Sequence, residues 1–247
     1  MSTEFDYASF PRRLNLGCGF DRRPGYLNVD FQPWHKPDLV ADVGKLNALP
    51  AAHYSEILAN DVLEHLPRTD TTKILVHWNR LLVHDGVLQL RVPDALAILE
   101  SLKSRRNQSV QAQERIIQTL FGTQAYTGDF HFTSFTKVLL AHYLEAAGFG
   151  SVRIRALSDG NLESIARKVR NVAPHEVGDF SELLAIADDD TFVRECYVSL
   201  LKREADAEGA AFYVLALSEG RMDRALVIEG LVNSPERKAM TQRGVGS

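Results

Sequence analysis

A glycine turn at the end of an apolar strand constrains the fold of this chain more than any other feature. Residues 13–16 read as a short buried strand, and Gly17-Cys18-Gly19 follows it directly. A second short strand ends in Asp30. Glycine has no Cβ, so backbone N–H groups can approach a ligand closely, and an acid at the tip of the next strand can accept hydrogen bonds from ribose hydroxyls. The pattern therefore predicts a site for a nucleoside-type cofactor.

The spacing within this pattern argues against a nicotinamide cofactor. Phe20 follows the second glycine, and the third glycine of a dinucleotide fingerprint is missing. Asp30 comes 13 residues after Gly17, whereas a nicotinamide-binding fold places its acid about 20 residues after the glycine motif. Only about one helical turn fits between the two strands, which leaves no helix N-terminus for a pyrophosphate. A nicotinamide dehydrogenase therefore fails on spacing.

Apolar runs alternate with helical patterns through the first two-thirds of the chain. This alternation is typical of a Rossmann-like, doubly wound and mostly parallel sheet in an α/β fold. The pattern predicts a helix over 70–83 that ends at Gly86, and a second helix over 135–147 capped by Ser134. The strands that we expect are residues 13–16, 26–29, 39–41, 56–59, 87–92, 152–155 and 164–167.

The strand signals stop near Pro174, and the rest of the chain has helical patterns only. Charge changes at the same place: residues 1–173 carry 20 Lys and Arg against 18 Asp and Glu, and residues 174–247 carry 8 against 14. We therefore expect two domains, an α/β domain over 1–173 and an appended small α-helical bundle over 174–247.

Composition excludes several classes of protein. The chain is 45% hydrophobic and 24% charged, as in soluble globular proteins, and no apolar run is long enough to span a membrane. Residues 1–4 lack the pattern of a signal peptide, so a cytoplasmic location is expected by default. Basic residues are scattered, which argues against a nucleic-acid partner. The two cysteines lie far apart without a His-rich spacing, and no metal site is expected.

Five motifs in order resemble those of class I S-adenosylmethionine-dependent methyltransferases, and the small-molecule "type 11" group is most similar. The likeness covers roughly residues 10–170. The motifs are Leu14-Asn-Leu-Gly-Cys-Gly, Gly25-Tyr-Leu-Asn-Val-Asp30, Asp42, Asn60-Asp-Val-Leu-Glu-His65-Leu-Pro and Leu81-Leu-Val-His-Asp-Gly86-Val. Separately, residues 192–236 resemble a phycobilisome-linker-like helical domain of unknown function, which is often attached to enzymes of bacterial surface-polysaccharide assembly.

The resemblance implies a seven-stranded sheet with S-adenosyl-L-methionine across the carboxyl ends of the strands. Gly17 and Gly19 are then expected beside the methionine and ribose portions, with Asp30 on the ribose hydroxyls. Asp42 and the Val43 backbone are expected at the adenine. Asn60 and Asp61 are expected at the methionine amino group, largely through their carbonyl groups. The full set of cofactor-binding residues that the resemblance implies is Asn15, Gly17, Cys18, Gly19, Asp30, Asp42, Val43, Asn60 and Asp61.

An amine or hydroxyl acceptor must lose a proton during methyl transfer, so a general base is useful. His131 is the first candidate, because it lies in the loop before the helix predicted over 135–147. His65 is the second and Tyr126 the third. His131 can equally be a plain loop residue, and His65 can cap or pack the start of a helix.

These observations predict in-line methyl transfer to oxygen or nitrogen of a small molecule or glycan acceptor, including a sugar, nucleotide-sugar or surface-polysaccharide precursor. The helical tail is expected to form a homodimer or to bind a partner enzyme. The alternative is a non-catalytic S-adenosylmethionine-binding scaffold or regulatory protein, which would keep the pocket without transferring a methyl group.

Overall fold

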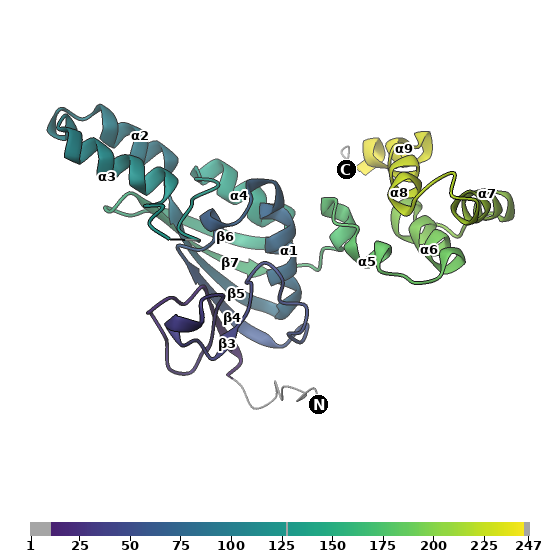
Figure 1. Cartoon of the computed structure of the whole chain (residues 1–247), viewed down its shortest axis with the longest axis horizontal. Helices are drawn as coiled ribbons and strands as arrows, with labels where there is room; N and C mark the ends of the chain where they lie inside the picture. The colour runs from purple at the N-terminus through teal and green to yellow at the C-terminus, as the bar shows by residue number, and fades with distance from the viewer. Residues whose placement is uncertain (1–10, 127, 245–247) are drawn as a thin grey trace. The chain divides into compact units, whose positions relative to one another are not determined.

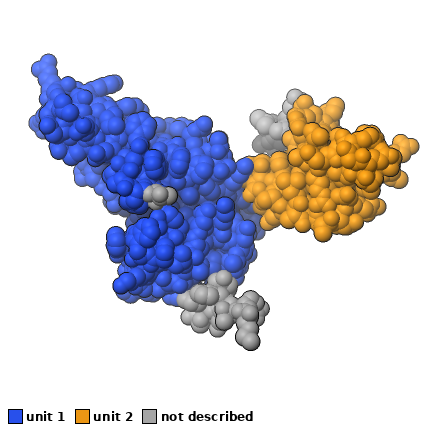
Figure 2. Space-filling model, in the orientation of Figure 1, with its two compact units in different colours: residues 1–172 blue, residues 173–247 orange. Residues whose placement is uncertain are grey.

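The structure is a computed structural model that describes residues 11–126 and 128–244. The prediction about a signal peptide concerns residues 1–4, which lie outside the described part. The chain divides into two compact units at Val172 and Ala173, shown in separate colours in Figure 2. Each unit is described by itself below.

The first unit is built on a seven-stranded sheet with the order β3-β2-β1-β4-β5-β7-β6 (Figure 1). The first five strands of the chain pair in parallel, and β7 pairs antiparallel with both β5 and β6. This arrangement confirms the predicted fold class. The strands are β1 Arg13–Leu16, β2 Leu27–Asp30, β3 Leu39–Val40, β4 Tyr54–Asn60, β5 Leu82–Pro93, β6 Phe149–Ala156 and β7 Asn161–Lys168.

The central strand β1 determines where a ligand can bind. From β1 the chain moves outward to β2 and β3, and it then returns to the other side of β1 as β4. Open α/β sheets hold ligands outside the carboxyl ends of the strands at such a reversal. Leu14, Leu16, Leu27 and Val29 are completely buried, as expected for strands that are covered on both faces. The glycine turn lies at the carboxyl end of β1.

The first long helix, α1 Thr71–Leu81, is shorter than its predicted range. The sequence predicts a helix to residue 83 with Gly86 as its C-terminal glycine, and this is wrong. Leu82 begins β5 directly, and Gly86 lies inside that strand. Lys168 replaces the glycine cap: its Nζ donates 2.8 Å hydrogen bonds to the carbonyl oxygens of Asn79 and Leu82. A side chain from β7, 86 residues further along the chain, therefore satisfies the end of this helix.

Substitution of Lys168 by methionine should show how much this cap contributes. We expect Lys168→Met to lower the free energy of unfolding by about 1–3 kcal/mol, because two buried carbonyl groups lose their donor while the apolar stem is kept. Urea unfolding gives the value. Lys45→Met is the matched control, since the Lys45 side chain is 81% exposed. Equal stabilities of the two variants would contradict this account of the helix end.

Three further α-helices lie in the described residues of the first unit: α2 Ala95–Lys103, α3 Val110–Phe121 and α4 Lys137–Ala146. Helices α2 and α3 pack against each other, and α4 packs on α1 and β6 (Figure 1). The predicted Ser134 cap is wrong: Thr136 caps α4, and the Ser134 hydroxyl donates to the Pro93 carbonyl. Phe135 forms a parallel bridge with Asp94 and is completely buried, so the chain is still extended there.

The described residues of the second unit form helices joined by loops, with no strand. Its buried core includes Phe192, Val193, Cys196 and Leu200 from one continuous apolar face, as the sequence pattern predicts. Its elements are α5 Ser181–Leu184, α6 Asp189–Cys196 with a π-helical turn Tyr197–Leu201, α7 Ala207–Ser218, α8 Arg224–Val232 and α9 Pro235–Gly244. In the described part of the chain, every helix is too short or too polar to cross a membrane.

Candidate functional site

A pocket of about 690 Å³ opens at the carboxyl ends of β1, β2, β4 and β5. Small-molecule sites in proteins have volumes of roughly 300–1,000 Å³. All nine residues that the sequence predicts to bind the cofactor lie on its wall, together with two of the three predicted catalytic residues. The predicted residues on the wall are Asn15, Gly17, Cys18, Gly19, Asp30, Asp42, Val43, Asn60, Asp61, His65 and Tyr126.

The glycine turn has a backbone that other residues rarely adopt. Gly17 and Gly19 have φ angles of +60° and +50°, in the left-handed region. A Cβ on Gly17 would lie 2.3 Å from Cγ2 of Val62, whereas a Cβ on Gly19 would meet no protein atom within 4 Å. Gly17 is therefore required for packing. Gly19 leaves open space at the pocket wall.

Asp30 joins the end of β2 to this turn. Its Oδ2 accepts a 2.8 Å hydrogen bond from the Gly19 N–H, and its Oδ1 accepts one of 2.8 Å from the Gln32 N–H. His35 Nδ1 lies 3.1 Å from Oδ1, close enough for an ion pair if the ring is protonated but without hydrogen-bond geometry. Asp30 is 4% exposed. A carboxylate has about four acceptor positions, so both oxygens keep acceptor capacity for a ligand.

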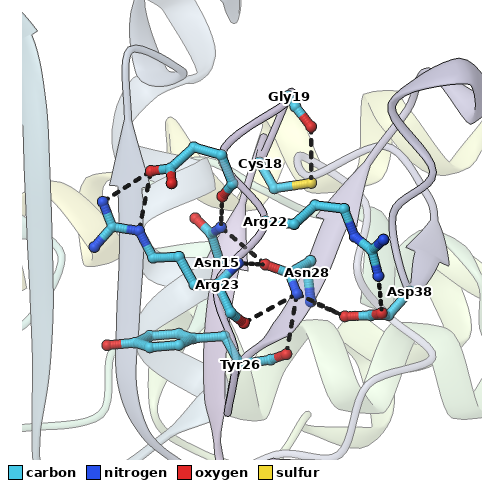
Figure 3. A network of polar contacts seen from close by, with 9 residues as sticks. Asn15, Cys18, Gly19, Arg22, Arg23, Tyr26, Asn28 and Asp38 are labelled. Carbon is cyan, nitrogen blue, oxygen red and sulfur yellow. Dashed lines mark hydrogen bonds and ion pairs between the residues drawn. The ribbon is translucent and has the colours of Figure 1, made fainter.

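A network of polar side chains supports the turn from behind (Figure 3). Asn15 and Asn28 are opposite each other in the register of β1 and β2, and their side chains share a 3.0 Å hydrogen bond. Asn28 also donates to Asp38, which forms an ion pair with Arg22. Backbone and side-chain hydrogen bonds from Asn28 and the Arg22 guanidinium hold the pKa of Asp38 below its usual value, against the effect of burial. Both amide protons of Asn15 are used inside this network.

Cys18 fills space within the turn. Its side chain is buried, and its backbone N–H donates to the Val29 carbonyl. Burial, reinforced by the charge of Asp30, raises the pKa of the Cys18 thiol to about 11. The thiolate is the nucleophilic form of cysteine, so this residue contributes shape to the pocket and is a poor nucleophile at neutral pH.

Asp42 and Val43 form the wall beyond β3. The Asp42 carboxylate accepts from the Gly44 N–H at 2.9 Å. The Val43 carbonyl accepts a 2.9 Å hydrogen bond from the indole N–H of Trp78, which is completely buried in α1. The Val43 backbone is therefore held by the core, and the Asp42 side chain remains about half exposed.

Asn60 and Asp61 follow β4, and Arg91 comes from the neighbouring strand β5. Asp61 has a left-handed backbone, with φ at +54°, and its N–H donates to the Arg91 carbonyl. The Arg91 guanidinium lies 3.2 Å from Asp61 and 3.2 Å from Asp159. Burial raises the pKa of Asp61, and the charge of Arg91 opposes this shift. Arg91 was not among the predicted residues, although its place before Pro93 at the carboxyl end of a strand was a usable signal.

The three predicted catalytic residues occupy different places. His65 and Tyr126 line the pocket, whereas His131 lies behind His65, with ring centroids 4.6 Å apart and nearly perpendicular planes. Burial lowers the pKa of both histidines, and each ring lies near Asp129, which opposes the shift. Burial raises the pKa of the Tyr126 hydroxyl. His131 Nδ1 lies 3.0 Å from the Thr119 carbonyl. Among these residues, His65 is the imidazole on the pocket wall.

Glu64, next to His65, is the most deeply buried carboxylate near the pocket. It is 1% exposed, and burial raises its pKa to about 8. Its backbone carbonyl accepts a 2.8 Å hydrogen bond from the Phe132 N–H, which joins the loop before α4 to this turn. Glu64 lies within the motif of residues 60–67, and no role was predicted for it. A glutamate in a polar turn is ordinarily exposed, so its burial could not be predicted.

Two exposed phenylalanines, Phe20 and Phe31, line the pocket and were not among the predicted residues. Phe20 is 83% exposed and contacts His35 edge-on, with ring centroids 4.6 Å apart. Phe31 packs against Gly128, at a distance that leaves no room for a Cβ on that glycine. The other wall residues that were not predicted are Asp21, Arg23, His35, Val62, Leu66, Arg91 and Gly128.

One family model matches most of the second unit. The second unit matches DUF4214, a domain of unknown function, over residues 178–241. The resemblance to phycobilisome linkers and the predicted role of this unit in dimerisation or partner binding stay predictions. No curated protein matches the chain.

Solved structures match about two-thirds of the chain at low identity. A possible exported protein from Bordetella parapertussis is 17% identical over 65% of this chain, with a TM-score of 0.47, and the match spans only 63% of that protein. A SAM-dependent methyltransferase from Archaeoglobus fulgidus is 14% identical over 65% of this chain and 87% of its own, with a TM-score of 0.46. A 1,6-didemethyltoxoflavin-N1-methyltransferase from Burkholderia thailandensis, solved with S-adenosylhomocysteine, is 17% identical over 64% and 71%, with a TM-score of 0.41. At such scores, any functional assignment depends on the pocket residues of this chain.

Proposed function

We propose that the first unit binds S-adenosylmethionine in this pocket and transfers its methyl group to oxygen or nitrogen of a small molecule or glycan. In this proposal Asp30 accepts hydrogen bonds from the ribose hydroxyls, and Asp42 with the Val43 backbone binds the adenine. Asn60 and Asp61 bind the methionine amino group. The observation that carries the proposal is the buried carboxylate of Asp30, which is held to the glycine turn by a 2.8 Å hydrogen bond at the reversal point of the sheet.

The charges on the pocket wall support a cationic ligand over a pyrophosphate. Four carboxylates line the pocket, from Asp21, Asp30, Asp42 and Asp61, against two guanidinium groups. Arg23 pairs with Asp21, and Arg91 pairs with Asp61. The remaining acidic charge fits a sulfonium and an ammonium group, and it would repel phosphates. The open space beside Gly19 leaves room for close approach of the ligand.

His65 and Tyr126 on the pocket wall support removal of a proton from the acceptor. When bound, S-adenosylmethionine supplies a methyl group that is already activated for attack, so positioning of the acceptor provides much of the acceleration. Because burial lowers the pKa of His65, this imidazole is neutral at physiological pH and able to take a proton. Tyr126 lies on the same wall and can position the acceptor by hydrogen bonding.

The test has two stages. Calorimetry should first show binding of S-adenosylmethionine to the full chain at one site. The protein is then incubated with isotopically labelled cofactor and a panel of sugars, nucleotide-sugars, lipid-linked glycans and small amines, and mass spectrometry identifies any product that gains the label. Binding without transfer to any acceptor would favour the scaffold alternative. Absence of binding would contradict the proposal.

A further inference from the structure

Three potential metal ligands gather at the part of the pocket wall that His65 forms. Glu64 and His65 lie in the 3-10 turn Leu63–His65 after β4, and His131 comes from the loop before α4. One ligand atom from each residue lies within 4.8 Å of the other two. Tetrahedral ligands at about 2.1 Å from a metal ion are about 3.4 Å apart. A small movement of the side chains would therefore close the site around an ion.

Two polar atoms in this cluster are buried without a hydrogen-bond partner. They are Oε2 of Glu64 and Nδ1 of His65. Glu64 is 1% exposed, and a buried carboxylate oxygen without a partner is costly. Arg91, the guanidinium whose charge reaches Glu64, forms its ion pairs with Asp61 and Asp159 instead. A bound cation would satisfy both atoms.

A contact with α3 fixes the His131 ring in an orientation suited to ligation. His131 Nδ1 lies 3.0 Å from the Thr119 carbonyl. A ring that donates Nδ1–H to this oxygen keeps its Nε2 lone pair free, which is the usual arrangement of a metal-bound histidine. The backbone N–H of His131 donates to the Phe121 carbonyl at 3.1 Å. Together with the bond from Phe132 N–H to the Glu64 carbonyl, this holds the loop against the turn.

We propose that Glu64, His65 and His131 bind one divalent transition-metal ion, through Glu64 Oε2, His65 Nδ1 and His131 Nε2. One carboxylate with two imidazoles suits Zn²⁺, Fe²⁺, Co²⁺ or Mn²⁺, whereas Mg²⁺ and Ca²⁺ prefer oxygen ligands. The sequence alone predicts no metal site, because 66 residues separate the two histidines.

If the first unit transfers methyl groups as proposed above, an ion at this site would help to deprotonate the acceptor. His65 and the neighbouring Asp61 line the pocket, so an open coordination position can face the acceptor. A coordinated hydroxyl loses its proton more readily, because the ion stabilises the resulting oxyanion. The O–H bond breaks, and the oxygen keeps the electron pair as a nucleophile. With Nδ1 of His65 on the ion, its other ring nitrogen carries a proton, so the acceptor proton leaves to water and not to His65. The site therefore selects an acceptor with a hydroxyl group.

The experiment measures metal binding directly. The full chain is stripped with a chelator and titrated with Co²⁺, and visible absorption reports ligation while elemental analysis gives the stoichiometry. We expect one equivalent, with Glu64→Gln and His131→Ala each binding at least about 100-fold more weakly, since loss of an outer-shell partner alone costs about 10–100-fold. His84→Ala is the control: this histidine is 74% exposed beside Asp85, and its loss should leave Co²⁺ affinity unchanged. Circular dichroism verifies that each variant is folded.

The outcomes separate this proposal from the proposed function. Wild-type protein that binds less than one equivalent, or a His131→Ala variant that binds as tightly as wild type, would overturn the metal site. Calorimetry with S-adenosylmethionine on the stripped protein tests the cofactor pocket independently. Metal binding without cofactor binding supports the metal site and removes the proposed methyl transfer.

Discussion

The Gly17→Ala variant is expected to lose about 2–5 kcal/mol of unfolding free energy and to bind no S-adenosylmethionine at concentrations that saturate the wild type. Two effects add. Gly17 has a φ angle of +60°, where a Cβ is strained. The new methyl group would also lie 2.3 Å from Val62 Cγ2. Either the glycine turn or the segment after β4 that contains Val62 must therefore move. Denaturant unfolding and calorimetry measure the two losses.

Gly19→Ala is the matched control for this prediction. Gly19 has a similar φ angle of +50°, but its Cβ would meet no protein atom. We therefore expect only the backbone cost of about 1–2 kcal/mol. Adding Val62→Ala to Gly17→Ala removes both Cγ atoms that clash and should restore part of the stability, as a double-mutant cycle measures. Equal stability of Gly17→Ala and Gly19→Ala would show that the contact with Val62 does not matter.

The Asp30→Asn variant is expected to bind S-adenosylmethionine about 100-fold more weakly, because hydrogen bonds to a charged group contribute about 1.5–3 kcal/mol each and 1.4 kcal/mol is a tenfold change. An asparagine can accept only through one oxygen, so the N–H of Gly19 or of Gln32 also loses its acceptor. Calorimetry gives the dissociation constant, and near-ultraviolet circular dichroism reports the packing around the turn.

Asp85→Asn provides the comparison for the charge change. Asp85 is 69% exposed at the side chain, and it lies in β5 away from the pocket wall. Its substitution should leave cofactor affinity unchanged. A folded Asp30→Asn variant with the wild-type dissociation constant would remove the observation on which the proposed function depends.

The strands around the pocket could be predicted because their signals are local. A buried apolar strand that runs into Gly17, and a second that ends in Asp30, are patterns within 18 residues, and the two strands pair in parallel as expected. All nine predicted cofactor residues then lie on one wall, because the carboxyl ends of parallel strands share an edge. The roles of these residues stay predictions.

Other features depend on contacts between distant segments, which a sequence pattern does not reveal. Gly86 is typical of a helix end, yet Lys168 caps α1 from 86 residues away and the chain enters β5 at Leu82. Ser134 is typical of a helix cap, yet the bridge of Phe135 to Asp94 keeps the chain extended. The proximity of His131 to Glu64 likewise depends on the folding of the loop before α4.

The hydrogen bond from Trp78 to Val43 gives the pocket an optical reporter. The chain has two tryptophans. Trp34 is 57% exposed, whereas Trp78 is completely buried, with its indole bonded to the backbone of the pocket wall. Iodide in solution quenches the emission of the first and cannot reach the second. The fluorescence that remains in iodide therefore comes from Trp78. Any ligand that displaces the Val43 backbone must change this emission.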